Sequence, residues 1–119
     1  MDSNALKKRT KDFTASCLKL LAGETQSNRL FWHVENQLIR CATSVAANYR
    51  AACLGQSRAA FIAKLSIVLE ESDECIFWLE IMEEHLSIKN EPLLKQVKLE
   101  AEELTRIFAS ARKTLQSKK

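Results

Sequence analysis

Glycine and proline are scarce in this chain of 119 residues, which contains two glycines and one proline. Because these residues interrupt helices and form tight turns, their scarcity leaves few positions at which a helix would break. Alternating runs rich in Val, Ile and Thr, which indicate β-strands, are also missing. Hydrophobic residues still make up 46% of the chain. The sequence therefore predicts long helices and excludes a fold built from many short strands.

The chain also lacks the features of an exported or membrane protein. No run approaches the roughly 20 apolar residues that span a bilayer, and the N-terminal stretch MDSNALKKRTKDF has no apolar export segment. Small exported proteins are dense in cysteine, whereas here no Cys-x-x-Cys pair occurs and the cysteines stand far apart, at Cys17, Cys41, Cys53 and Cys75. We therefore expect one soluble domain over residues 1–119, in the cytoplasm and without a membrane contact.

Apolar residues recur at steps of three and four along four segments, which is the spacing of one helix face. The predicted helices cover residues 4–22, 28–54, 58–88 and 91–116. Gly23 should end the first helix in the left-handed conformation that glycine adopts freely, and Gly55 should break the second. The expected capping residues are Ser27 or Asn28, Ser57 and Asn90, with Pro92 in the first turn of the last helix.

Each predicted helix carries one continuous stripe that should face the core. The stripes are Leu6, Thr10, Phe13, Cys17, Leu20 and Leu21; Phe31, Val34, Leu38, Ala42, Val45, Tyr49 and Ala52; Phe61, Leu65, Val68, Ser72, Cys75, Leu79, Met82 and Leu86; and Leu94, Val97, Ala101, Leu104, Phe108, Ala111 and Leu115. The alternation of three and four is typical of left-handed bundle packing, and short loops favour antiparallel neighbours. The predicted fold is an all-α, left-handed, antiparallel up-down-up-down four-helix bundle.

The third predicted helix carries acids in its middle, at Glu70, Glu71, Asp73 and Glu74. At about 100° per residue these acids fall outside the arc that holds the core stripe. The same outer arc also contains Ile67, Phe77, Trp78 and Ile81. Burying one such side chain stabilises a protein by about 1.5–3 kcal/mol, so leaving all of them in water would be unfavourable.

This second apolar face predicts an oligomer interface that the acids border or cross. The second predicted helix offers small outward residues and Arg40, whose planar fork suits carboxylates. Arg40, Arg50 and Arg58 could meet the acids within one chain or across to a neighbour. The predicted interface residues are Arg40, Ser44, Asn48, Glu70, Glu71, Glu74, Phe77, Trp78 and Ile81. The alternative is a solvated face with ordinary pairs inside one helix.

No residue set in the sequence indicates catalysis or metal binding. Di-iron bundles use Glu-x-x-His, but neither His33 nor His85 has a glutamate three positions before it. The pairs Glu70–Glu74 and Glu80–Glu84 could hold a hard cation, yet the sequence offers no convergent ligands for it. Cys17 and Cys75 fall on core stripes and the other two cysteines at stripe edges, as small buried hydrophobes do. We expect no enzyme, cofactor, metal or small-molecule substrate.

The net charge is +3, and much of the basic surplus lies at the chain ends. Basic ends can contact phosphate groups, although solvated termini are the simpler explanation. The candidate nucleic-acid contacts are Lys7, Lys8, Arg9, Lys11, Arg112, Lys113, Lys118 and Lys119. Trp32 is a weak candidate for stacking on a base, because Arg29 and His33 lie beside it. A residue at an interface or at the edge of the bundle is the favoured alternative for Trp32.

The stretch QLIRCATSVAANYRAACLGQSRAAFIAKLSIVLEESDECIFWLEI resembles the four helix bundle family, also called intervening-sequence proteins because some are encoded within insertions in large-subunit ribosomal RNA genes. The resemblance extends from Phe31 to Leu86. Matching positions are Gln37, Leu38 or Ile39, Arg40, Ala42, Ser44, Val45, Asn48, Gly55, Ser57, Phe61, Leu65, Glu70, Glu71 and Glu74. The family often has Ala-Glu-Gly where this chain has Arg50-Ala51-Ala52, so the glutamate of that motif is missing here.

The resemblance implies an antiparallel bundle that forms a ring-shaped homo-oligomer, commonly a pentamer. It also implies a role connected with nucleic acid, since a related bundle is the accessory protein of a reverse transcriptase in diversity-generating elements. We therefore expect an oligomeric scaffold or accessory protein that binds RNA, DNA or an RNA-handling protein. The alternatives are a self-assembling protein-interaction module without a nucleic-acid ligand and, with no support from the residues, an enzyme.

Overall fold

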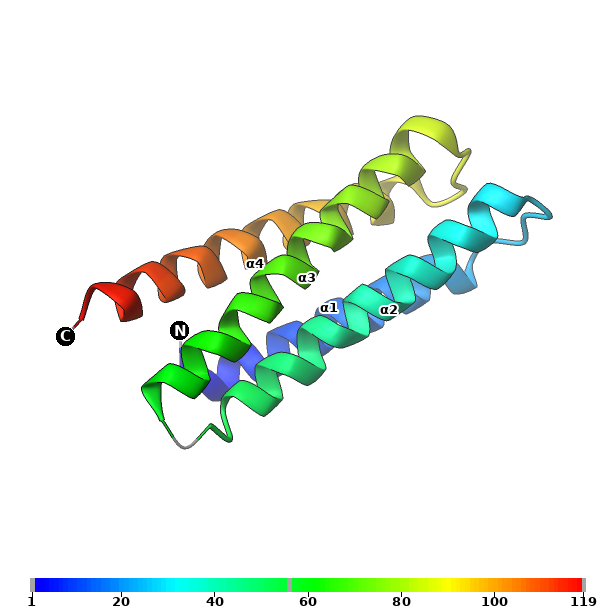
Figure 1. The fold of residues 1–119 in the computed structure, drawn as a ribbon. Coiled ribbons are helices and arrows are strands. Elements are labelled where there is room, and N and C mark those ends of the chain that lie inside the picture. Colours follow the sequence, from blue (N-terminus) through cyan, green and yellow to red (C-terminus); the bar gives the residue numbers. More distant parts are fainter. Residues whose placement is uncertain (1, 56, 119) are drawn as a thin grey trace.

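The computed structural model of the protein describes residues 2–55 and 57–118. Its helices are α1 (Ser3–Ala22), α2 (Arg29–Ala52), α3 (Arg58–His85) and α4 (Glu91–Ser117). They run alternately in opposite directions (Figure 1). Each helix packs against its neighbour in sequence, and α1 also contacts α4. The expected all-α four-helix fold is confirmed, and every helix boundary lies within three residues of its predicted position.

Capping side chains fix where the helices begin. Three of the expected caps are confirmed: Asn28, Ser57 and Asn90 each accept hydrogen bonds from backbone N–H groups in the first turn of α2, α3 and α4. The cap of α1 was not expected. Its Asp2 carboxylate accepts a hydrogen bond from the backbone N–H of Ala5 at 2.7 Å, which satisfies one of the amides that a helix start leaves without a partner.

The expected left-handed conformation at Gly23 is wrong. Gly23 has φ −76°, and the turn continues right-handed because its N–H donates to the carbonyl of Lys19 at 3.3 Å. Gly55 is needed for a different reason: a Cβ atom there would lie 2.9 Å from the carbonyl oxygen of Ala52. A Cβ atom at Gly23 would lie 3.6 Å from the carbonyl oxygen of Leu20, which is an ordinary contact. Close backbone approach, not a positive φ, explains the second glycine.

The core follows the predicted stripes. Every stripe residue of α1 and α2 is buried, as are the central stripe residues of α3 and α4. Phe61, Leu86, Ala111 and Leu115, at the ends of the stripes, are half-buried. Cys41 was placed at a stripe edge but is completely buried, because the wide apolar face of α2 points between α1 and α3. Cys53 is half-buried.

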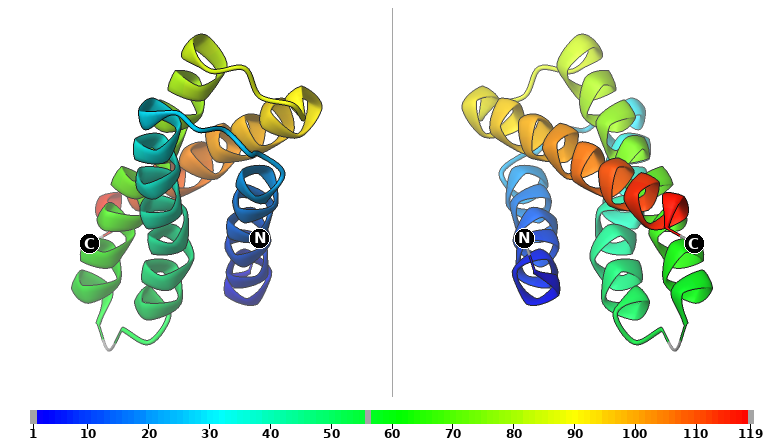
Figure 2. Two further views of the ribbon diagram at one scale, coloured as in Figure 1. Left: turned by 90° about the vertical axis from the view of Figure 1, so that its right-hand side faces the viewer. Right: turned by 90° about the vertical axis from the view of Figure 1, so that its left-hand side faces the viewer.

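Helix α4 crosses the bundle at an angle to α1. Figure 2 shows that α4 starts near the end of α1 and finishes near the start of α3. Side-chain contacts agree with this path, since Arg9 of α1 pairs with Glu100 of α4, while Arg58 at the start of α3 donates to the carbonyl of Leu115 near the end of α4. None of the helices in residues 2–55 and 57–118 is long and apolar enough to cross a membrane.

The two glycines provide a matched pair of substitutions. Gly55→Ala should lower the free energy of unfolding by roughly 1–2 kcal/mol, because the new Cβ atom displaces a backbone carbonyl. Gly23→Ala should raise the free energy of unfolding by about 0.4–1 kcal/mol, because φ −76° suits alanine and the unfolded chain loses freedom. Urea denaturation followed by circular dichroism measures both. Equal stability of Gly55→Ala and the wild type would contradict the close approach.

Candidate functional site

Two of the acids in the middle of α3, Glu71 and Glu74, form ion pairs within the same chain. The Arg40 guanidinium of α2 lies 3.1 Å from a Glu71 carboxylate oxygen and also pairs with Glu74. The Trp78 indole N–H donates to Glu74 at 3.2 Å. The hydrogen bond between Arg40 and Glu74 raises the pKa of Arg40 and lowers the pKa of Glu74. The sequence left open whether Arg40 would meet acids of its own chain, and the structure shows that it does.

The apolar residues on the outer side of α3 are only partly covered. Phe77 is 50% exposed and Ile67 39% exposed. Trp78 and Ile81 are half-buried against the core. The ring of Phe77 meets the ring of Trp78 edge to face, with centroids 4.9 Å apart, and Trp78 meets His33 of α2 in the same way at 5.4 Å. The protomer therefore shelters part of this aromatic cluster and leaves Phe77 at its rim.

The rest of the predicted interface lies along α2. Asn48 donates from its side-chain amide to the Ser44 carbonyl at 3.0 Å and to the Ser44 hydroxyl at 2.8 Å, so the pair forms a local contact on the helix. Toward the connection from α2 to α3, Leu54 is 77% exposed. Together with small side chains of both helices and Ile67, it lines a shallow depression of about 790 Å³. Apolar surface thus lies at both ends of α3's outer side.

We call the predicted interface residues of α2 and α3 the α2/α3 surface: Arg40, Ser44, Asn48, Glu70, Glu71, Glu74, Phe77, Trp78 and Ile81. Contacts join Arg40 to Glu71 and Glu74, and Glu74 in turn to Trp78. Glu70 is exposed and has no ion pair among the described residues. The surface therefore has a paired polar centre, an aromatic rim and free carboxylate charge.

The basic residues predicted to contact nucleic acid do not form one surface. Arg9 donates to both carboxylate oxygens of Glu100 at 2.7 Å and lies 3.1 Å from Glu103, an arrangement that ties α1 to α4 and raises the pKa of Arg9. Arg112 approaches the Ser66 hydroxyl of α3 at 3.4 Å. Lys113 and Lys118 are exposed, and Lys119 lies outside the described residues.

The other three predicted contacts, Lys7, Lys8 and Lys11, line a groove of about 570 Å³ between α1 and α2. Arg50 of α2 completes the charged rim of this groove. Sequence reasoning considered Arg50 as a partner for acids of α3 and did not connect it with the N-terminal lysines. The only signal that could have connected them is the antiparallel register, which places the last turn of α2 beside the first turns of α1.

A buried acid that sequence reasoning missed holds the opposite end of the bundle together. Glu24 is 9% exposed. Its carboxylate accepts from the backbone N–H of Lys89 and from the Gln26 amide, both at 2.9 Å, and Gln26 also donates to the Ser87 carbonyl at 2.8 Å. These bonds join the α1–α2 connection to the α3–α4 connection, so the role of Glu24 is structural.

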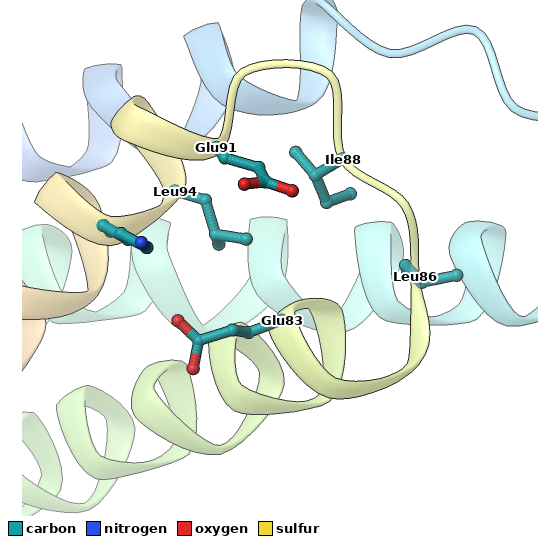
Figure 3. Close-up of a pocket in the computed structure, with 6 residues that line it drawn as sticks. Glu83, Leu86, Ile88, Glu91 and Leu94 are labelled. Atoms are coloured by element: carbon teal, nitrogen blue, oxygen red, sulfur yellow. The ribbon is translucent and has the colours of Figure 1, made fainter.

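The same end contains a small pocket of about 220 Å³ (Figure 3). Glu83 reaches it from α3, Ile88 from the connection, and Glu91 and Leu94 from the first turns of α4. The pocket is smaller than typical ligand sites of roughly 300–1,000 Å³. Lys98 already pairs with Glu83 at 2.9 Å. The lining of the pocket holds no nucleophile beside a base.

The buried cysteines are not activated nucleophiles. Burial raises the pKa of the Cys17 thiol, and a hydrogen bond to Cys41 together with burial raises the pKa of the Cys75 thiol. The sulfur atoms of Cys41 and Cys75 lie 3.2 Å apart. No group of His, Cys, Asp or Glu within residues 2–55 and 57–118 is arranged to hold a metal ion.

Two comparisons with known proteins give a match. The profile of a family described as 23S rRNA-intervening sequence proteins matches residues 3–110. A crystal structure from Bacteroides thetaiotaomicron, described as a protein with unknown function from the S23 ribosomal protein family, is 28% identical with a TM-score of 0.77, and the alignment covers 95% of this chain and 99% of that chain. A comparison with curated proteins gave no match. These similarities indicate no enzyme family.

The cysteines should differ sharply in reactivity. In native protein a thiol reagent such as DTNB should label Cys53 first, because it is the half-buried cysteine, whereas the buried thiols of Cys17, Cys41 and Cys75 should react only as the bundle unfolds. Absorbance of the released thiolate gives the count per chain. Cys53→Ala should remove the fast phase, and rapid labelling of a second cysteine in folded protein would contradict the packing of these thiols.

Proposed function

This chain belongs to the family of 23S rRNA-intervening sequence proteins, and on that basis we propose that it is a non-enzymatic homo-oligomeric bundle that associates with nucleic acid as a scaffold or accessory protein. The proposed copy number is five, which the family resemblance implies. The observation that carries the proposal is the partly exposed apolar side of α3, centred on Phe77.

The exposed apolar area favours self-association. Phe77, Ile67 and Leu54 are 50%, 39% and 77% exposed. Since full burial of one such side chain is worth about 1.5–3 kcal/mol, covering what remains exposed would contribute roughly 1 kcal/mol for each residue. Small side chains of α2 and α3 lie beside Leu54, so the backbone of a sister copy can approach closely there.

The polar group formed by Arg40, Glu71 and Glu74 on the α2/α3 surface is suited to the edge of an interface. Arg40 is already neutralised by Glu71 and Glu74, so a sister copy would not have to bury an unpaired guanidinium. Glu70 and Asp73 are exposed and have no ion pair among the described residues. Charges of this kind at the edge of an interface contribute to orientation more than to affinity.

Support for a nucleic-acid ligand comes from the distribution of charge. The end of the bundle where α1 and α3 begin and α2 and α4 finish (Figure 1) carries the acids Asp2, Asp12, Glu70 and Glu71. Apart from Arg9, which Glu100 and Glu103 neutralise, it carries the cations Lys7, Lys8, Lys11, Arg50, Arg58, Lys64, Arg106, Arg112, Lys113 and Lys118. An oligomer would repeat this basic end in every copy, and such a field attracts phosphate.

Phe77→Glu should give soluble, helical protein of smaller mass than the wild type. The substitution puts a charge into the proposed contact, and Phe77 is exposed enough for the protomer to fold without it. Size-exclusion chromatography with light scattering measures the mass. Leu99→Glu is the matched control, because Leu99 is 65% exposed on α4, away from the α2/α3 surface, and should leave the oligomer intact. A monomeric wild type would contradict the interface.

Binding of the wild-type protein to structured RNA should weaken steeply with salt. Each phosphate contact steepens the fall of log K with log salt by about 0.7–0.9, so four contacts predict a loss of roughly 50- to 150-fold between about 50 and 200 mM. Fluorescence anisotropy of a labelled RNA hairpin measures this dependence. An oligomer that binds no nucleic acid even at low salt would instead favour the alternative function, a self-assembling module for a protein partner.

A further inference from the structure

The groove between α1 and α2 combines a charged rim with an uncharged floor. Lys7, Lys8 and Lys11 come from the first turns of α1, and Arg50 comes from the last turn of α2. Positions 7 and 11 are four residues apart and therefore lie on the same helix face. Because the two helices are antiparallel (Figure 1), Arg50 faces these lysines across the groove.

The floor of the groove is small and neutral. Ala46 and Ala47 of α2 line it together with Thr14 and Thr43. The Thr14 hydroxyl donates to the Ala42 carbonyl at 2.8 Å, and the Thr43 hydroxyl donates to the Ile39 carbonyl at 2.7 Å. Both hydroxyl protons are thus used by the bundle itself. The short side chains keep the groove open, and its charge comes from the rim alone.

The positive charge of the rim is largely unopposed. Lys7, Lys11 and Arg50 form no ion pair within residues 2–55 and 57–118. Lys8 pairs with Asp12 at 2.7 Å, but their side chains are 79% and 62% exposed, and surface pairs of this kind are worth only about 0–1 kcal/mol. Like charges four residues apart on a helix repel each other, so the groove is an electrostatically unfavourable arrangement until an anion enters it.

The cations of α1 lie on two sides of the helix, and Arg9 differs from the lysines of the groove in being neutralised by acids. Arg9 lies on the opposite side of α1 and is neutralised by Glu100 and Glu103 of α4. The ion pairs of Arg9 therefore tie α1 to α4 and stabilise the fold. The three lysines around Arg9 form no ion pair with another helix among the described residues. The groove lining contains no aromatic side chain, so it offers nothing on which a base could stack.

We propose that this groove binds the phosphodiester backbone of a nucleic acid, with Lys7, Lys11 and Arg50 as the principal contacts. The inference rests on the proposed function and assigns its ligand contact to one surface. Recognition through cations alone reads charge and not base sequence, so affinity should be similar for different sequences of equal length. The groove would hold a polyanion along the row of cations at its rim.

The test compares two triple substitutions with the same change in charge. The groove variant is Lys7→Gln, Lys11→Gln and Arg50→Gln. The control variant is Lys19→Gln, Lys95→Gln and Arg29→Gln, three exposed cations at the end of α1, the start of α4 and the start of α2, near the opposite end of the bundle. Fluorescence anisotropy with labelled single-stranded RNA and DNA of equal length and two unrelated sequences gives affinity and salt slope. Circular dichroism and light scattering confirm the fold and the oligomeric state of each variant.

The groove variant should bind at least about tenfold more weakly at low salt, with a salt slope reduced by about 2, since each lost contact to a single strand removes about 0.7. The control variant should keep most of the wild-type affinity. Equal weakening of both variants, or none, would overturn the groove while leaving the proposed function standing. Absence of any nucleic-acid binding by the wild type would overturn both.

Discussion

Helix α3 has more apolar surface than one protomer can cover. Its inner stripe is buried between α2 and α4, while Phe77 and Ile67 remain partly exposed on its outer side. A helix turned to bury these residues as well would carry its acids into the core, where ionised carboxylates are strongly unfavourable. The rotation of α3 is therefore fixed by the inner stripe, and the outer apolar residues stay partly exposed.

The contacts of the acids of α3 agree with a rotation of the helix that keeps these acids out of the core. Arg40 draws Glu71 and Glu74 toward α2, and Trp78 shares the Glu74 carboxylate. This network attaches the outer side of α3 to α2 without burying a charge deeply. It also places paired polar groups between the aromatic residues of α3 and the depression beside Leu54. The aromatic residues of α3 and Arg40 are of the kinds that are enriched at protein interfaces.

Sequence reasoning predicted the fold well because the stripes repeat without interruption. Every stripe residue of α1 and α2 is buried, and three caps were identified from side chains that compete for helix-start amides. It was wrong about Gly23, whose conformation depends on how the following residues leave the helix. It missed Glu24, because its partners Lys89 and Ser87 are contributed by a distant connection.

The candidate surfaces were predictable only in part, because some of their residues are far apart in the sequence. The outer arc of α3 follows from helical periodicity alone, so Phe77 could be placed outside the core. By contrast, Arg50 and the lysines of α1 are about forty residues apart, and nothing local indicates that they line one groove. Periodicity also does not separate Arg9, which ties α1 to α4, from Lys7 and Lys11, because that distinction depends on where Glu100 lies.

The claim that a sister copy covers the outer side of α3 has one most direct test. Native mass spectrometry of the wild-type protein at micromolar concentration measures the copies held together without altering any residue. The account predicts a single dominant species at a multiple of the 13.5 kDa chain mass, and the family resemblance points to five copies. A dominant species at the mass of one chain would contradict it.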